Sequence, residues 1–211
     1  MQLIGMLDSP YVRRVAISLQ LLGLPFEHQS VSVFSTFERF RTINPVVKAP
    51  TLICDDGSLL MDSNLILEYA EAHPNKQRAL VPRDLPGLQR SLRIIGLAMA
   101  ANEKSVQIVY EHHQRPAEKL HQPWLERITG QLHDAYAALE REFAQSAPAL
   151  ASDSIDQATL STAVAWHFSR RIIADVITAD AYPHLEALSL QAEKLPEFAA
   201  APYGAGTYRA A

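Results

Sequence analysis

Three short segments near the start of the chain carry residues suited to holding a small charged molecule. The first is Asp8-Ser9-Pro10, in which Ser9 suits the N-cap of a helix and Pro10 its first position. A helix start collects unpaired N–H groups and partial positive charge, so it favours an anion. The Ser9 hydroxyl can donate to that anion as well, although the same residues also suit a helix start without a ligand.

The second segment is Lys48-Ala49-Pro50-Thr51-Leu52. A proline at the start of a strand removes one hydrogen-bond donor there. If the bond before Pro50 is cis, Ala49 can turn its backbone N–H and C=O outward, where they can pair with an extended peptide. Lys48 can then meet a carboxylate. An ordinary loop is the alternative for this segment.

The third segment is Asp62-Ser63, directly before a run with helical spacing. Ser63 and the N–H groups of a helix start suit a carboxylate, whereas Asp62 suits an ammonium group. The end of an amino acid carries both charges, so the pair suits such an end. Helix capping alone is the alternative.

The elements that must position these segments follow the order β-α-β, a short helix, then β-β-α. A β-α-β unit gives a right-handed crossover and a parallel strand pair, to which a hairpin adds antiparallel strands. The three segments then lie at strand ends and helix starts, so they can converge on one edge of one sheet. The predicted elements are a strand at Gln2–Leu7, a helix at Tyr11–Leu22 followed by Gly23, a strand at Glu27–Phe34, a short helix opened by the capping-box spacing Ser35-Thr36-Phe37-Glu38 and ended near Asn44-Pro45, a hairpin over Thr51–Met61, and a helix at Asn64–Glu71.

Beyond residue 83 the apolar spacing is helical throughout. The expected helices are Leu85–His113, Pro123–Gln145, Ser154–Ile177 and His184–Lys194, the third opened by the capping-box spacing Ser154-Ile155-Asp156-Gln157 and the last stopped by Pro196. Gly204-Ala205-Gly206 is typical of a loose tail.

Composition excludes several classes of protein. A chain of 211 residues and 23.4 kDa, with 48% hydrophobic and 20% charged residues, can bury a sizeable core without a metal or disulfide. The net charge of −4 argues against binding to nucleic acid, and one cysteine, Cys54, excludes an internal disulfide or a cysteine-based metal site. The N-terminus does not resemble a signal peptide and no apolar run is long enough to span a membrane, so we expect a soluble cytoplasmic protein.

Taken together, the motifs resemble those of the glutathione transferase family. The matching segments are Ser9–Val15, Asn44–Leu52, Asp62-Ser63 with Ile66-Leu67-Glu68-Tyr69, and the capping box at Ser154. The resemblance covers nearly the whole chain and is greatest to bacterial members with Ser-Pro at the active site. It implies a thioredoxin-like α/β domain over residues 1–75, a linker over 76–83, an all-α domain over 84–203 and a tail over 204–211.

The resemblance also implies roles for individual residues. Ser9 would hold the glutathione sulfur, and Ala49, before a cis Pro50, would pair its backbone with the cysteinyl part. Asp62 and Ser63 would hold the γ-glutamyl end, and Lys48 the glycyl carboxylate. Three residues depart from the family's usual pattern: Val47 stands where glycine is frequent, Asp62 where glutamate is commoner, and Gln157 where aspartate is usual.

The implied reaction is attack of the glutathione thiolate on a hydrophobic electrophile, a detoxification chemistry that uses glutathione as co-substrate and no metal. The electrophile would enter an apolar hollow between the domains, for which the candidate lining residues are Tyr11, Phe34, Asn102, Val106, Tyr110 and Trp166. The resemblance further implies a homodimer across the N-terminal domain of one subunit and the helical domain of the other. The charge and the apolar spacing lead us to expect neither nucleic acid nor membranes as partners. A glutathione-dependent isomerase or peroxidase, or a non-catalytic ligand-binding protein on the same fold, are the alternatives.

Overall fold

The computed structural model describes residues 1–146, 148 and 150–209, which form two compact units. The first unit comprises Met1–Val81, Ala151–Ser154 and Glu193–Ala211. The second comprises Pro82–Leu150 and Ile155–Ala192. The last segment therefore belongs with the first unit, whereas the sequence boundaries placed residues 193–203 in the all-α domain.

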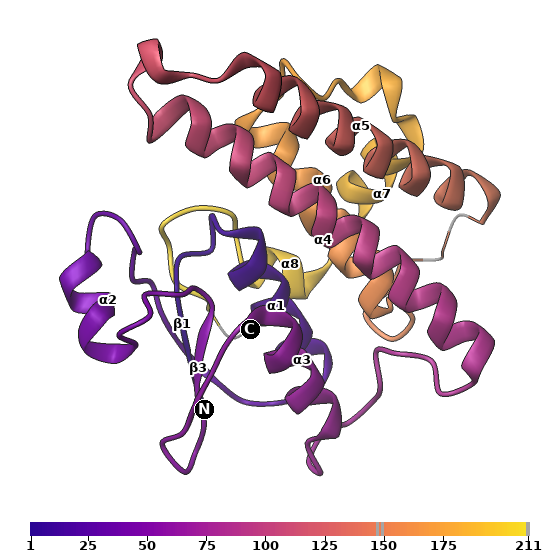
Figure 1. Ribbon diagram of the computed structural model, residues 1–211. Coiled ribbons are helices and arrows are strands. Elements are labelled where there is room, and N and C mark those ends of the chain that lie inside the picture. The colour runs from indigo at the N-terminus through magenta and orange to yellow at the C-terminus, as the bar shows by residue number, and fades with distance from the viewer. Residues whose placement is uncertain (147, 149, 210–211) are drawn as a thin grey trace. The chain divides into compact units, whose positions relative to one another are not determined.

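The first unit is built on a small mixed sheet (Figure 1). Its strands lie in the order β2-β1-β3-β4, with β1 parallel to β2 and antiparallel to β3. The predicted β-α-β and hairpin arrangement is thus confirmed. The elements are β1 (Gln2–Ile4), α1 (Pro10–Leu21), β2 (Glu27–Gln29), α2 (Phe37–Ile43), β3 (Thr51–Ile53), β4 (Leu59–Leu60), α3 (Ser63–Ala72) and, after the second unit, α8 (Pro196–Ala200).

Helix α1 packs against both strand β1 and helix α3, and its apolar side chains form much of the core of this unit. Its side chains Val12, Val15 and Leu19 are fully buried, and each such burial is worth about 1.5–3 kcal/mol relative to exposure. Gly23 follows the helix with a φ of +69°, a left-handed conformation that favours glycine, as the sequence predicts.

The second strand is shorter than predicted. The alternating run Glu27–Phe34 forms a strand only as far as Gln29. Beyond it, the Ser32 hydroxyl accepts from the backbone N–H groups of Phe34 and Ser35, and these local bonds fix a turn in place of a strand ladder. Thr36 begins α2 without capping it, because its hydroxyl bonds to the backbone of Ser32, so the capping box predicted there is wrong.

The C-terminal segment is held against the first unit rather than forming the loose tail that the sequence suggested. Pro196 opens the short helix α8, a common position for proline at a helix start. Further on, the Tyr208 ring stacks on Phe26 with centroids 4.5 Å apart, and the Ser30 hydroxyl donates to the Ala205 carbonyl at 2.8 Å.

His28 links this segment to the end of β1, and its geometry fixes where its proton lies. Nε2 lies 2.7 Å from the Gly5 carbonyl oxygen, which can only accept, so Nε2 carries the hydrogen. Nδ1 is then bare and accepts from the Tyr208 backbone N–H at 3.0 Å. A second proton on the ring would put two donors face to face.

We therefore expect the docking of the C-terminal segment to weaken in acid. Burial lowers the pKa of His28, against a smaller opposite effect of the Gly5 carbonyl, so the folded state holds its proton less tightly than the unfolded state. The stabilisation is full above the unfolded pKa of about 6.5 and is lost as pH falls through the lower pKa of the folded state. Hydrogen exchange of the Tyr208 amide between pH 7.5 and 5 measures this. The readout is the protection factor, the intrinsic exchange rate at each pH divided by the measured rate. His28→Gln is the control, and an equal loss of protection in acid in that variant would exclude His28 as the cause.

The second unit is helical (Figure 1). It contains α4 (Leu85–His113), η1 (Ala117–Lys119), α5 (Gln122–Gln145), α6 (Gln157–Ile172), η2 (Ala179–Ala181) and α7 (Pro183–Ala192). The bounds of α4 are those predicted. Helix α6 starts later than predicted because Asp156 is its N-cap, accepting from the Thr159 N–H at 2.8 Å, so the capping box at Ser154 is wrong. Its end at Ile172 is earlier than the predicted Ile177.

Three aromatic rings pack together within the otherwise largely aliphatic core of the helical unit. Tyr136 is fully buried, with its ring 5.0 Å from that of Trp166 and 6.0 Å from that of Tyr182. The Tyr136 hydroxyl lies 2.9 Å from the Ala165 carbonyl oxygen and 2.6 Å from the Ser169 hydroxyl, so its buried oxygen is satisfied. This core joins α4, α5, α6 and α7 into one unit.

Candidate functional site

The sheet register brings the first two candidate segments to the same edge. Ile4, the last residue of β1, pairs with Thr51, the first residue of β3. Because the two strands are antiparallel, the chain that leaves β1 toward Ser9 and the chain that enters β3 through Lys48, Ala49 and Pro50 meet there.

Gly5 allows these segments to approach closely. Its φ is +138°, and a Cβ added there would lie 2.6 Å from Val12 Cγ2 and 3.2 Å from Ala49 Cβ. No side chain fits between the end of β1, the first turn of α1 and the loop before Pro50. Sequence reasoning missed this glycine, and the signal that could have found it is an isolated glycine directly after a strand.

Ser9 is the N-cap of α1, as predicted, and is half-buried. Its Oγ accepts from the Val12 backbone N–H at 3.4 Å, so the hydroxyl proton remains available to donate elsewhere. None of the residues Tyr11, Val12 and Arg13 in the first turn is acidic, and Asp8, directly before the N-cap, carries the nearest carboxyl along the chain. Burial raises the pKa of the neighbouring Asp8 carboxyl, opposed by the Ser9 N–H.

The loop before β3 is fixed by Asn44, a buried residue. Its Nδ2 donates to the Thr51 hydroxyl at 2.8 Å, which in turn donates to the Lys48 carbonyl oxygen at 2.6 Å. Asn44 Nδ2 also lies 3.3 Å from the Met61 sulfur, the residue before Asp62. Asn44 thereby ties the second candidate segment to the third, a role that the sequence did not predict.

The same loop has the conformation that the family pattern leads one to expect. The Ala49–Pro50 peptide bond is cis, and Lys48 is exposed at the surface. Val47, which stands where the family often has glycine, has a φ of +51°. That left-handed conformation is rare for a β-branched residue, which explains why glycine suits the position.

The third segment forms the start of α3. Asp62 is the N-cap, with its carboxylate accepting from the Asn64 N–H at 2.9 Å, and it is exposed. Ser63 is buried and accepts from Nη1 of Arg14 at 3.2 Å. Arg14 lies on α1 five residues after Ser9, so this helix carries the first candidate segment at its start and bonds to the third through Arg14, while the second segment meets the start of the helix across Gly5.

The remaining candidates lie apart in sequence and differ in burial. Tyr11 is half-buried on α1, and Phe34 is 55% exposed. Asn102, Val106 and Tyr110 follow one another at intervals of four along α4, so they share one side of that helix. Asn102 is fully buried, and neither atom of its amide has a hydrogen-bond partner among the residues that the structure describes.

Trp166 differs from its expected role as a lining residue. It is 1% exposed, packs on Tyr136 in the core of the helical unit, and donates from Nε1 to Glu186 at 2.7 Å. Its side chain therefore belongs to the core of its own unit.

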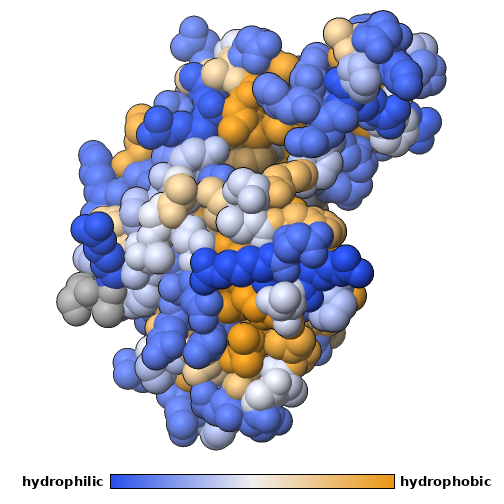
Figure 2. Space-filling view, turned by 90° about the vertical axis from the view of Figure 1, so that its left-hand side faces the viewer, coloured by the Kyte–Doolittle hydropathy of each residue, from blue (hydrophilic) through white to orange (hydrophobic). Residues whose placement is uncertain are grey.

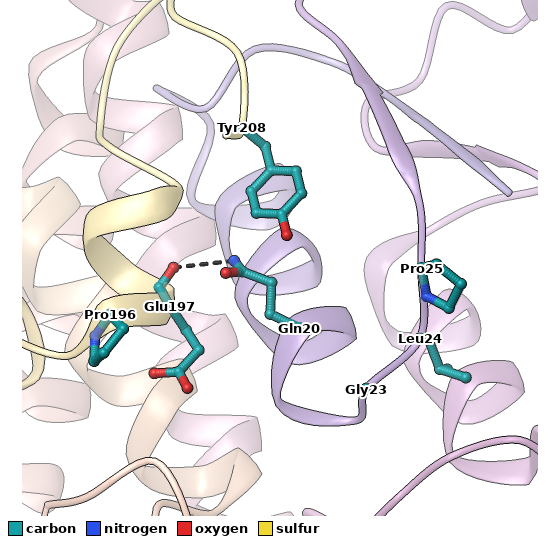
Figure 3. A pocket seen from close by; sticks show the side chains of 7 residues that line it. All are labelled: Gln20, Gly23, Leu24, Pro25, Pro196, Glu197 and Tyr208. Atoms are coloured by element: carbon teal, nitrogen blue, oxygen red, sulfur yellow. Dashed lines mark hydrogen bonds between the residues drawn. The ribbon is translucent and has the colours of Figure 1, made fainter. Parts of the chain in front are cut away.

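A pocket of about 490 Å³ lies elsewhere in the first unit (Figure 3). It is at the C-terminal end of α1, about 18 Å along the helix from Ser9 at 1.5 Å per residue. On one side of the pocket, the Gln20 side-chain amide donates from Nε2 to the Glu197 backbone carbonyl oxygen at 3.0 Å, which links α1 to α8. The residues that line it are Gln20, Gly23, Leu24, Pro25, Pro196, Glu197 and Tyr208, none of them a predicted site residue.

Two features are absent from the described part of the chain. Among these residues no group of three or more His, Cys, Asp or Glu side chains is placed to hold a metal ion. No described helix has the length and apolar character needed to cross a membrane.

Comparisons with known proteins agree with this geometry. Residues 3–78 match the family model of the glutathione S-transferase N-terminal domain. The chain is 29% identical to the uncharacterized GST-like protein YibF of Escherichia coli (strain K12) over 165 residues, which are 78% of this chain and 80% of that protein.

Two solved structures are similar over almost the full length. A glutathione transferase family member from Pseudomonas fluorescens Pf-5, with bound S-(propanoic acid)-glutathione, is 28% identical with a TM-score of 0.78, covering 95% of this chain and 98% of that one. A glutathione S-transferase from Methylobacterium radiotolerans, in complex with glutathione sulfonate, is 26% identical with a TM-score of 0.85, covering 96% and 95%. The chain thus has the glutathione transferase fold, a thioredoxin-like α/β domain followed by a helical domain, which confirms the predicted fold class.

Proposed function

We propose that this protein is a serine-type glutathione transferase that joins the glutathione thiolate to a hydrophobic electrophile. The observation that carries the proposal is the meeting of three segments around one helix. Ser9 caps α1, Ala49 approaches its first turn across Gly5, and Ser63 bonds to Arg14 one turn further on. They offer an anion site, a free backbone edge and a site for a zwitterionic amino-acid end.

The sulfur would lie beside Ser9. A free thiol has a pKa near 8.5 and is only a few per cent ionised at neutral pH, although the thiolate is the nucleophile. Lowering that pKa by about two units requires a preference of about 2.7 kcal/mol for the charged form. One hydrogen bond to a charged acceptor, worth about 1.5–3 kcal/mol, together with the start of α1 supplies this. The thiolate then forms a bond to carbon while the leaving group departs with its electron pair.

The rest of the tripeptide would use the other two segments. Ala49 would pair its backbone with the cysteinyl part, and the exposed Lys48 would meet the glycyl carboxylate. Ser63 and the N–H groups at the start of α3 would hold the γ-glutamyl carboxylate, and Asp62 the ammonium group. For the electrophile, the half-buried Val106 and the exposed Tyr110 and Phe34 remain candidates. No step in this scheme uses a metal.

Calorimetry with glutathione tests the binding, and product analysis with an aromatic halide tests the reaction. We expect saturable binding with one site per chain and a thioether product that consumes glutathione. With a cis-dienoate as substrate, glutathione recovered unchanged beside the trans isomer would identify an isomerase. With an organic hydroperoxide, which supplies the oxidant, oxidised glutathione beside the corresponding alcohol and water would identify a peroxidase. Absence of glutathione binding would favour a ligand-carrying protein.

We also propose a cytoplasmic homodimer. Hydrophobic residues reach the surface on the face in Figure 2, and large side chains such as Val46, Leu65 and Leu92 are more than half exposed. A contiguous exposed apolar patch, unlike single exposed side chains, marks a surface for protein–protein contact. The dimer would bring the first unit of one subunit against the helical unit of the other.

Sedimentation velocity tests the dimer. We expect a species of twice the 23.4 kDa chain mass at micromolar concentration. A single 23.4 kDa species at that concentration would contradict the proposal.

A further inference from the structure

We propose that Arg14 is the positioning residue that gives the site its preference for the γ-glutamyl carboxylate. This inference rests on the proposed function and adds to it a residue that does not itself touch the ligand. Arg14 lies on α1, is 1% exposed, and reaches the start of α3 with its guanidinium group.

A buried arginine is an expensive way to pack two helices. Removing a guanidinium from water costs free energy, and apolar side chains of similar volume often pack as well or better. Burial lowers the pKa of Arg14 to about 10, with the negative charge of Asp62 acting in the opposite direction. The packing of α1 on α3 therefore does not by itself account for a charge at this position.

The hydrogen bonds that Arg14 donates to the start of α3 explain why a charged donor lies at this position. A guanidinium group donates only, so Ser63 Oγ, 3.2 Å from Nη1, accepts there. The Ser63 hydroxyl can then donate its own proton to another acceptor, and a ligand carboxylate at the helix start would be such an acceptor. The same Nη1 donates to Asn64 Oδ1 at 2.7 Å, which fixes the next side chain of α3.

The charge of Arg14 also balances that of the N-cap. Asp62 would carry its negative charge toward the ligand ammonium, and the ligand carboxylate would bring a second negative charge to the same helix start. A buried positive charge beneath both lowers their mutual repulsion. Arg14 thus allows one helix start to accept both charges of an amino-acid end.

The neighbouring Arg13 is a matched control within the chain. It is equally buried on the same helix, but its guanidinium group bonds to Glu193, Phe198 and Ala201 in the C-terminal segment. An effect of losing a buried arginine from α1 is common to both residues, whereas an effect on the start of α3 belongs to Arg14 alone.

The test compares two probes that differ only in the α-carboxylate: S-methylglutathione, and its analogue with γ-aminobutyryl in place of γ-glutamyl. In Arg14→Met we expect the affinity for S-methylglutathione to fall about 10- to 100-fold, the range of one to two hydrogen bonds to a charged group, and the affinity for the analogue to change less than about 3-fold. Arg14→Lys, which keeps a donor and a charge, should restore part of the difference and provides the measurement if Arg14→Met does not fold. Arg13→Met should leave the ratio of the two affinities unchanged.

A double-mutant cycle of Arg14 and Ser63 shows whether Arg14 affects ligand affinity through Ser63 or through a general change in the structure of the site. In a Ser63→Ala background, Arg14→Lys should lower the S-methylglutathione affinity less than it does in the native chain. Equal losses for both probes in the Arg14 variants, or full additivity with Ser63→Ala, would overturn this inference and leave the proposed function standing. Failure of the native chain to bind S-methylglutathione would overturn both.

Discussion

Replacing Ser9 with alanine is expected to lower kcat/KM for thiolate conjugation by about 10- to 100-fold while leaving the affinity for S-methylglutathione within about 3-fold. In the proposed mechanism the hydroxyl would stabilise the sulfur only in its charged form, so its loss should raise the pKa of the bound thiol toward 8.5. The sulfur of S-methylglutathione is a thioether and carries no charge, so the affinity for this ligand should not depend on the Ser9 hydroxyl. Ultraviolet titration of the bound thiolate measures the pKa, and initial rates measure the turnover.

The pH dependence of this deficit provides a second measurement. As pH rises above 8.5, the thiol ionises without help, so the difference between the native chain and Ser9→Ala should narrow. Ser9→Thr, which keeps a hydroxyl, is the matched control and should retain most of the activity. The N-cap bond to Val12 is long at 3.4 Å, so we expect Ser9→Ala to cost about 1 kcal/mol of folding free energy or less. Native turnover in Ser9→Ala would remove Ser9 from the mechanism.

The largest expected effect on stability comes from Arg13. Its Nη1 and Nη2 bond to the two carboxylate oxygens of Glu193 at 2.6 and 2.7 Å, and its Nε donates to the Ala201 carbonyl at 2.8 Å. Arg13→Met removes the three donors Nη1, Nη2 and Nε from these acceptors. Loss of one partner of a buried pair costs about 3–5 kcal/mol, and since Glu193 is 25% exposed we expect about 3 kcal/mol, or about 6–12 °C in Tm.

Thermal and urea denaturation measure this loss. Arg41→Met is the control, because the pair of Arg41 with Glu38 is 3.9 Å long and both side chains are exposed. We expect that change to lie within about 0.5 kcal/mol of the native chain. The variant Arg13→Met with Glu193→Gln should be less destabilised than the sum of the two single variants. A loss in Arg13→Met no larger than that in Arg41→Met would contradict the assignment.

Local sequence signals predicted the elements whose stability is local. Apolar spacing gave α4 its bounds, and Ser9-Pro10 gave the start of α1, because capping and periodicity act within a few residues. Both capping boxes named the wrong N-cap residue. The first places Ser35 at the cap, whereas Thr36 holds that position and its hydroxyl bonds to the Ser32 carbonyl instead. The second places Ser154 there, whereas Asp156 caps the helix and the Ser154 hydroxyl bonds to the Ala151 carbonyl.

Contacts between residues that lie far apart in the chain could not be predicted from one sequence. Nothing near Asn44 in sequence indicates that its amide bonds to both Thr51 and Met61. Likewise, Arg13 and Arg14 are adjacent and chemically identical, yet one contacts the C-terminal segment and the other α3. Only the direction in which each side chain leaves the helix separates the two, and that direction has meaning only once both partners are in place.

The first unit is discontinuous along the chain, since it ends at Val81 and is completed by Ala151–Ser154 and the segment from Glu193 onward. A gene fragment encoding only the thioredoxin-like half would therefore lack the partners of a buried cation. Recombination between relatives faces the same restriction, because exchanging the helical half with everything after it would also exchange part of the half that was meant to be kept.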